Sequence, residues 1–85
     1  MSITYEVIFN GDSQGVYSDL NDARASFTYF SDMLAYFFRC EVASNRLTYN
    51  KIHTFEVELI EWHDGWGDTL DFSDYTPEDY QRDTF

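Results

Sequence analysis

Carboxylates are the side chains of this chain whose types and spacing could do chemistry. The stretch from Phe55 to Phe85 holds ten acidic residues and one basic residue, Arg82. Such a set could bind the lysines and arginines of a partner, hold a hard metal ion, or supply an acid–base pair. Each of these chemistries needs carboxylates at a defined spacing, which the elements of the fold must provide.

The spacing of two glutamates favours binding by charge. Glu56 and Glu58 lie two positions apart, so on a strand they share one face about 6.6–6.8 Å apart. One strand of duplex DNA carries a phosphate about every 3.4 Å of axis, so two phosphate steps cover the same interval. Four aspartates are expected to extend this negative strip along a neighbouring strand and its ends. They are Asp64, Asp68, Asp71 and Asp74.

Aromatic residues among these acids strengthen the binding interpretation. Trp62 or Trp66 could anchor a partner, because tryptophan is a frequent hot-spot residue and its ring stacks with arginine. Bases are nearly absent here, so the usual surface of interspersed charges is missing. The alternative is a solvated acidic face that serves only solubility.

Metal and catalytic interpretations have little support. Asp64, Asp68 and Asp71 offer the oxygen ligands that calcium or magnesium prefers, but they do not match the EF-hand loop. The spacing of Cys40, His53 and His63 matches no zinc signature, and we expect Cys40 to be a small buried apolar group. No metal and no cofactor is predicted.

The glutamate pair could act as acid and base, but every acidic strand offers such pairs. There is no nucleophile elbow, phosphate loop or metalloprotease helix, and the four glycines fit turns. We therefore expect a protein that is not an enzyme.

Composition bounds the class of partner. The 85 residues make one domain with a formal charge of −11. Nucleic acid and anionic membranes would repel it, so neither is expected as a direct partner. A single cysteine excludes an intramolecular disulfide and fits a reducing cytoplasm. We expect no signal peptide, and no apolar stretch approaches the roughly 20 residues of a membrane span.

Local patterns predict the elements that would position the acids. Residues 3–9 alternate between apolar and polar, Asn-Gly-Asp at 10–12 is turn chemistry, and 14–17 can return as a second strand. Apolar residues at spacings of three and four predict a helix over 19–42, capped by Ser18 or Asp19.

The second half of the chain predicts another hairpin. Residues 52–62 alternate, and apolar Ile60 and Trp62 break the pattern, which suggests a bulge or a second apolar contact. Residues 63–68 contain two glycines and predict a turn, and 69–73 can pair back as a final strand.

The order of elements predicts an α+β fold: a small antiparallel sheet of three or four strands with one long helix packed on one face, in the order ββαββ. Residues 1–75 are expected to form a single domain. Residues 76–85 are expected to form an acidic C-terminal tail or a single helical turn.

The aromatic helix raises the question of self-association. Phe27, Phe30, Leu34 and Phe37 form the stripe expected to face the core. The remaining large residues spread around more than half of the circumference and could form a homodimer face. They are Tyr29, Met33, Tyr36 and Phe38.

This short acidic single-domain chain resembles small phage-encoded inhibitors, notably anti-CRISPR proteins and other DNA mimics. The resemblance rests on the acidic strip and the single cysteine. It rests also on the style of the opening Tyr5–Gly11 and of Gly15–Tyr17, which a helix led by Asp19 follows. It implies a basic nucleic-acid-binding partner in the host cytoplasm, such as a CRISPR effector complex, whose lysines and arginines the acids would contact. The alternative function is a phage structural, assembly or oligomerising protein.

Overall fold

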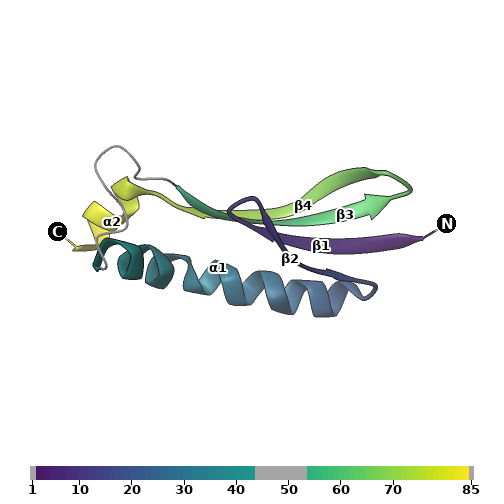
Figure 1. Cartoon of the computed structure of the whole chain (residues 1–85), viewed down its shortest axis with the longest axis horizontal. Coiled ribbons are helices and arrows are strands. Elements are labelled where there is room, and N and C mark those ends of the chain that lie inside the picture. Colours follow the sequence, from purple (N-terminus) through teal and green to yellow (C-terminus); the bar gives the residue numbers. More distant parts are fainter. Residues whose placement is uncertain (1, 44–53, 85) are drawn as a thin grey trace.

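The described residues fold into one four-stranded antiparallel sheet and two helices. The computed structural model describes residues 2–43 and 54–84 (Figure 1). The elements are β1 (Ile3–Phe9), β2 (Asp12–Tyr17), α1 (Leu20–Ala43), β3 (Phe55–His63), β4 (Trp66–Tyr75) and α2 (Pro77–Thr84). The strand order is β2-β1-β3-β4. The predicted α+β class and ββαββ order are confirmed, with α2 added after them. The predicted strand residues 52 and 53 lie outside the described residues.

The first hairpin forms where the Asn-Gly pair predicts a turn. Asn10 and Gly11 have φ values of 51° and 84°, in the left-handed region that glycine adopts freely and asparagine tolerates. Asn10 also joins β3. Its backbone N–H donates to the Glu56 carbonyl at 2.9 Å, and its side-chain oxygen accepts the Glu56 N–H at 2.8 Å. The turn therefore holds the first residues of β3 in register.

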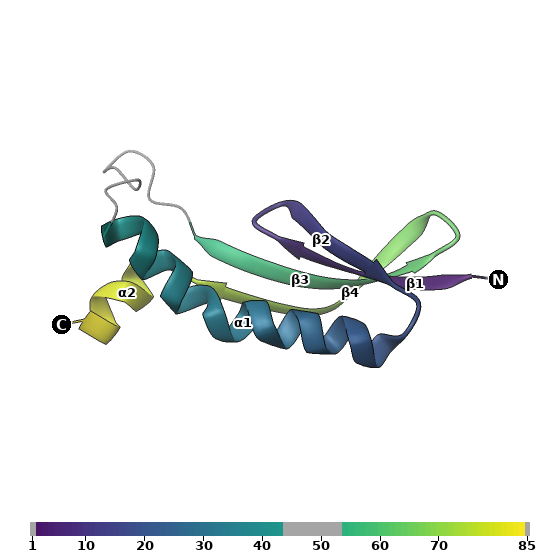
Figure 2. The ribbon, with the colours of Figure 1, turned by 60° about the horizontal axis from the view of Figure 1, so that its bottom comes forward.

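Helix α1 covers one face of the sheet. It begins after Asp19, whose carboxylate accepts the Asn21 N–H at 2.8 Å and so satisfies one of the free donors of the first turn. Figures 1 and 2 show α1 running along the sheet on one side only. The side chains that it buries are Ala23, Phe27, Leu34 and Phe38. They form the core with Val7, Val57, Leu59 and Tyr75.

Phe38 lies at the centre of the core, which corrects its assignment to a homodimer face. It is 1% exposed, and its ring lies 5.5, 5.3 and 5.4 Å from the rings of Phe55, Tyr75 and Tyr80. The end of β4 and helix α2 pack against this part of α1. The side of α1 that is buried here is therefore the side that carries Phe38. Phe37, which was expected in the core stripe, is only partly buried as a result.

The thiol of Cys40 is exposed, so its prediction as a buried apolar group is wrong. Cys40 follows Phe38 by two positions, which is about 200° around a helix. Because Phe38 points into the core, Cys40 faces solvent.

The C-terminal segment, which was expected to form a tail or a single helical turn, is a helix over Pro77–Thr84. The Thr76 hydroxyl accepts the Asp79 N–H at 3.1 Å, and the Asp79 carboxylate accepts the Thr76 N–H at 2.9 Å. This reciprocal pair is a capping box. The bonds from the Thr76 backbone and hydroxyl hold the pKa of Asp79 below its ordinary value. Tyr80 then packs on Phe38, which ties α2 to the core.

The second hairpin contains the predicted irregularity. Leu59 pairs with Asp71, but Ile60 pairs with Thr69, so Leu70 is an extra residue on β4. Because of this bulge, the β4 residues before Leu70 lie on the opposite face from the one that a regular alternation would give them.

None of the helices in the described ranges is both long and apolar enough to span a membrane.

Candidate functional site

One face of the sheet carries no helix. Helix α1 lies along the other face, and α2 lies beyond the end of β4, beside the C-terminal end of α1 (Figure 1). Val57 and Leu59 point toward α1 and are fully buried, so Glu56, Glu58 and the alternate residues after them point away from the helices. We call this helix-free side the open face.

Strand pairing identifies the other side chains of the open face. Its acidic residues are Glu6, Glu56, Glu58 and Asp74, and its large apolar residues are Ile8, Val16, Ile60, Trp62 and Phe72. Val16 is 59% exposed and Phe72 is 47% exposed. A surface with aromatic and aliphatic side chains beside carboxylates is typical of a binding site rather than of a merely solvated face.

The four acids form a diagonal row across the open face. Asp74 lies directly opposite Glu56, Glu58 is two residues further along β3, and Glu6 lies opposite Ile60 on β1. With strands about 4.8 Å apart and about 3.3 Å of rise per residue, the row spans about 16 Å from Asp74 to Glu6. Apolar residues flank it on both sides, because Ile8 and Phe72 are the two cross-strand neighbours of Glu58.

No basic side chain neutralises this row within the described residues. The arginines of the described ranges lie on the helices: Arg24 and Arg39 on α1, and Arg82 on α2. Within the described residues, Glu6 is hydrogen-bonded to a neutral donor: the Trp62 indole Nε1–H donates to Glu6 Oε1 at 3.1 Å. That bond orients both side chains and leaves the negative charge in place.

The pair of Glu56 and Asp74 works against folding. Directly opposite residues on an antiparallel pair have Cβ atoms about 4.5–5.5 Å apart, and like charges at that distance are destabilising. No described cation lies on the open face to offset this repulsion. A positively charged partner that bound here would relieve the repulsion between the two carboxylates.

The structure divides the predicted acidic strip between two faces. Glu56, Glu58, Asp74 and Trp62 lie together on the open face. Asp68 and Asp71 pair with Glu61 and Leu59 on the helix side, where Trp66 also lies opposite His63. Asp64 occupies the turn with a φ of 45°. Asp71 is on the helix side because it lies three positions from Asp74 on a regularly alternating strand, whereas Asp68 is there because the bulge at Leu70 changes the face of the β4 residues before it.

Sequence reasoning missed Glu6, Ile8 and Phe72 as members of the open face. Glu6 lies fifty residues before Glu56 in the chain, and only the pairing of β1 with β3 brings them together. The alternation of residues 3–9 already placed Glu6 and Ile8 on the side opposite Val7. What was absent was the register between the two hairpins.

The end of the second hairpin holds a separate cluster on the helix side. His63 contacts the Glu61 carboxylate through Nε2, and its ring stacks on Trp66 with centroids 4.7 Å apart. Asp68 lies opposite Glu61. In the described part of the chain no set of three or more acidic, histidine or cysteine side chains could hold a metal ion. His53, the other histidine weighed as a zinc ligand, lies outside that part.

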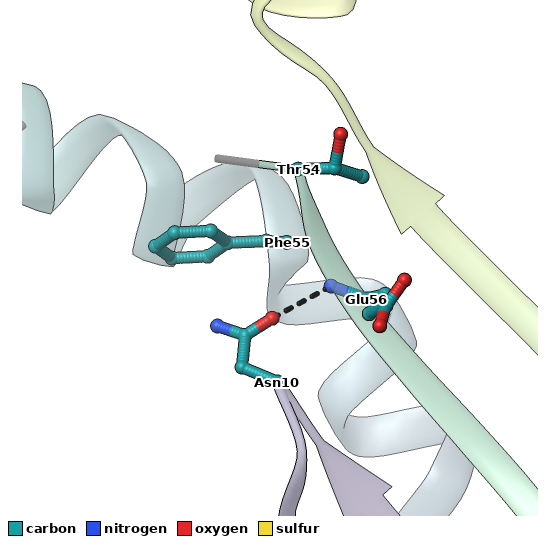
Figure 3. A pocket seen from close by; sticks show the side chains of 4 residues that line it. All are labelled: Asn10, Thr54, Phe55 and Glu56. Atoms are coloured by element: carbon teal, nitrogen blue, oxygen red, sulfur yellow. Dashed lines mark hydrogen bonds between the residues drawn. The ribbon is translucent and has the colours of Figure 1, made fainter. Parts of the chain in front are cut away.

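A shallow pocket lies where the first hairpin turn meets β3 (Figure 3). Asn10, Thr54, Phe55 and Glu56 line it. The side-chain oxygen of Asn10 already accepts the Glu56 backbone N–H. Asn10 and Glu56 therefore join the first hairpin turn to β3 at this place.

The free edge of β4 has one further feature. The Asp71 carboxylate accepts the N–H of Phe72 at 2.9 Å. This backbone donor is therefore satisfied from within β4 itself.

Comparisons of the chain with protein-family models, with curated proteins and with solved structures find no match.

Proposed function

We propose that this chain is a non-catalytic inhibitor that binds a basic nucleic-acid-binding protein and covers the surface where nucleic acid would lie. The observation that carries the proposal is the open face, where four carboxylates in a row lie among apolar side chains with no described base beside them. Lysine and arginine side chains that normally hold phosphates would find carboxylates at comparable spacing. The apolar flanks would supply area that excludes water from the contact.

The proposed mechanism is steric and electrostatic occlusion. A chain with a charge of −11 is drawn toward a positive surface over long distances, so association should be fast and should weaken as salt rises. The resemblance to phage anti-CRISPR proteins and DNA mimics supports a host defence effector as the target, in the cytoplasm of the infected cell. The competing function, a structural or assembly protein, rests on the exposed side of α1 described below.

The proposal is tested by reversing charges on each face separately. Glu56→Lys with Glu58→Lys changes the open face, and Asp12→Lys with Asp68→Lys makes the same change in charge on the helix side. The tagged protein is used to capture partners from nuclease-treated lysate over a salt series. We expect basic nucleic-acid-binding proteins to be captured by the wild type and by the second variant, to be lost with the first, and to be displaced by added duplex. Equal loss with both variants would show that only net charge matters.

A further inference from the structure

The outward side of α1 carries a second regular pattern besides the stripe that faces the sheet. Residues at alternating spacings of three and four form an uncharged row along the helix, and we call this row the α1 seam. It consists of Ser26, Tyr29, Met33, Tyr36, Cys40 and Ala43. Alternating spacings of three and four are the repeat with which two helices pack along a common seam. A continuous uncharged row is notable in a chain that is 25% charged.

No described element covers the α1 seam. Figures 1 and 2 show α1 at the outer side of the molecule, with the sheet on its other side. Tyr29 and Tyr36 are 55% and 56% exposed, and Cys40 is exposed as well. Both tyrosines lean on rings nearer the sheet, with centroids 5.2 Å from Phe30 and 5.8 Å from Phe37. The rings of the seam are thus held in place before any partner arrives.

Charge favours a second copy as the occupant. Outside α1, the described chain has thirteen acids and one arginine, Arg82, whereas α1 itself carries Arg24 and Arg39 against three acids. Two copies that approached through their sheets would bring the acidic rows together. An approach along α1 avoids that repulsion, so among the described elements α1 offers the surface on which the acidic chain can best meet itself.

Two charged residues beside the α1 seam, Asp32 and Arg39, favour an antiparallel arrangement of two copies and determine its register. When Met33 lies opposite Tyr36 of a second copy in an antiparallel pair, Tyr29 lies opposite Cys40, and Asp32 lies beside Arg39. The two-fold axis repeats each of these contacts. Shifting the pair by one heptad instead puts Asp32 beside Asp32. The seam from Ser26 to Ala43 is about 26 Å long, so the preferred register uses its whole length.

We propose that this chain forms an antiparallel homodimer through the α1 seam, in the register that pairs Met33 with Tyr36. The two sheets then lie on opposite sides of the paired helices, and both open faces stay accessible. A dimer would present two acidic faces to a partner that carries two basic surfaces. This proposal stands apart from the function of the open face, because neither surface contributes residues to the other.

Cysteine cross-linking tests the orientation. Replacing Tyr29 by cysteine places a thiol opposite the native Cys40 of the second copy, at a distance that a disulfide can span. We expect Tyr29→Cys to cross-link quickly on mild oxidation, while the wild type and a Thr28→Cys control, which is off the seam on the same turn, do not. Rapid Cys40–Cys40 cross-linking of the wild type would indicate a parallel pair and overturn the proposal.

Sedimentation over a wide range of protein concentration tests the dimer itself. Tyr36→Ser removes two contacts per dimer and should weaken association by about 100-fold. Asp32→Arg brings like charges together at both ends and should weaken it by about tenfold. Arg39 is left unchanged because its charge also acts on Tyr75, whose pKa burial raises and Arg39 lowers. The dimer should persist in about 1 M salt, where capture through the open face is lost. A wild-type protein that stays monomeric at every concentration would overturn the proposal and leave the open face unaffected.

Discussion

The like-charge pair of Glu56 and Asp74 leads to a prediction in which stability and binding move in opposite directions. Asp74→Asn removes the repulsion and keeps the shape of the side chain. Cross-strand pairs contribute roughly 0.2–1 kcal/mol, so the free energy of unfolding should rise by about that amount at low salt. In a domain of this size, 1 kcal/mol corresponds to a shift in Tm of about 4–8 °C, and the upper end of the expected gain should be measurable.

Salt separates this effect from others. The Debye length is about 30 Å at 0.01 M salt and about 3 Å at 1 M, whereas the two Cβ atoms lie about 4.5–5.5 Å apart. The gain should therefore be largest in dilute buffer and nearly absent in about 1 M salt. The measurement is urea unfolding of wild type and variant at both salt concentrations.

Asp12→Asn is the matched control. It removes the same charge from a strand position whose partner is Phe9, not an acid, so it reports the benefit of lowering the overall charge of −11. Asp74→Asn should exceed this control in stability while capturing less of the basic partner. If the two variants gain the same stability, or if the gain persists in high salt, the pair is not a local source of strain and the argument for its role in binding fails.

Three further predictions concern the core, the open face and α2. Phe38→Ala should cost about 3–5 kcal/mol in urea unfolding, because it empties the centre of the aromatic cluster. Gly67→Ala should shift Trp62 fluorescence and weaken partner capture, since an added Cβ would lie 2.8 Å from Ile60 and 3.0 Å from the Trp62 ring. The pKa of Asp79 is lowered in the folded state. Its carboxylate therefore stabilises α2 above the ordinary pKa of about 3.9, and this contribution is lost as pH falls below that value; NMR signals of the α2 residues should show the helix opening.

Each of these predictions has an outcome that would contradict it. A cost below about 1 kcal/mol for Phe38→Ala would mean that the aromatic cluster can close around the gap. Unchanged Trp62 emission in Gly67→Ala would place the indole elsewhere. An α2 that stays folded well below the ordinary aspartate pKa would show that packing of Tyr80, not the capping box, holds the helix.

Short-range patterns predicted most of the fold. The alternation in residues 3–9, the Asn-Gly turn and the apolar spacing of α1 each depend on neighbours within a few positions, and all three are present in the structure. An irregularity beside Ile60 was also predicted, but the extra residue is Leu70 on β4, and Ile60 and Trp62 keep the alternation of β3 as apolar members of the open face. The spacing of Thr76 and Asp79 is also that of a capping box, but the high acidity of the segment favoured its interpretation as a tail.

The membership of the open face could not be predicted in the same way. It depends on the register between the two hairpins and on one extra residue, Leu70, which sends Asp68 to the helix side. The burial of Phe38 instead of Phe37 depends on where α2 packs. Both are consequences of long-range contacts that leave no periodic signal in the sequence.

The hydrogen bond between Asp71 and Phe72 has a consequence for what the protein does at high concentration. An exposed edge strand normally offers its free N–H groups to a strand of another molecule, which is how ordered aggregates grow. Here the carboxylate already occupies the place of an incoming carbonyl, and its charge repels any identical copy. The sheet therefore resists extension beyond β4, and a protein with Asp71 replaced by alanine should form fibrils sooner.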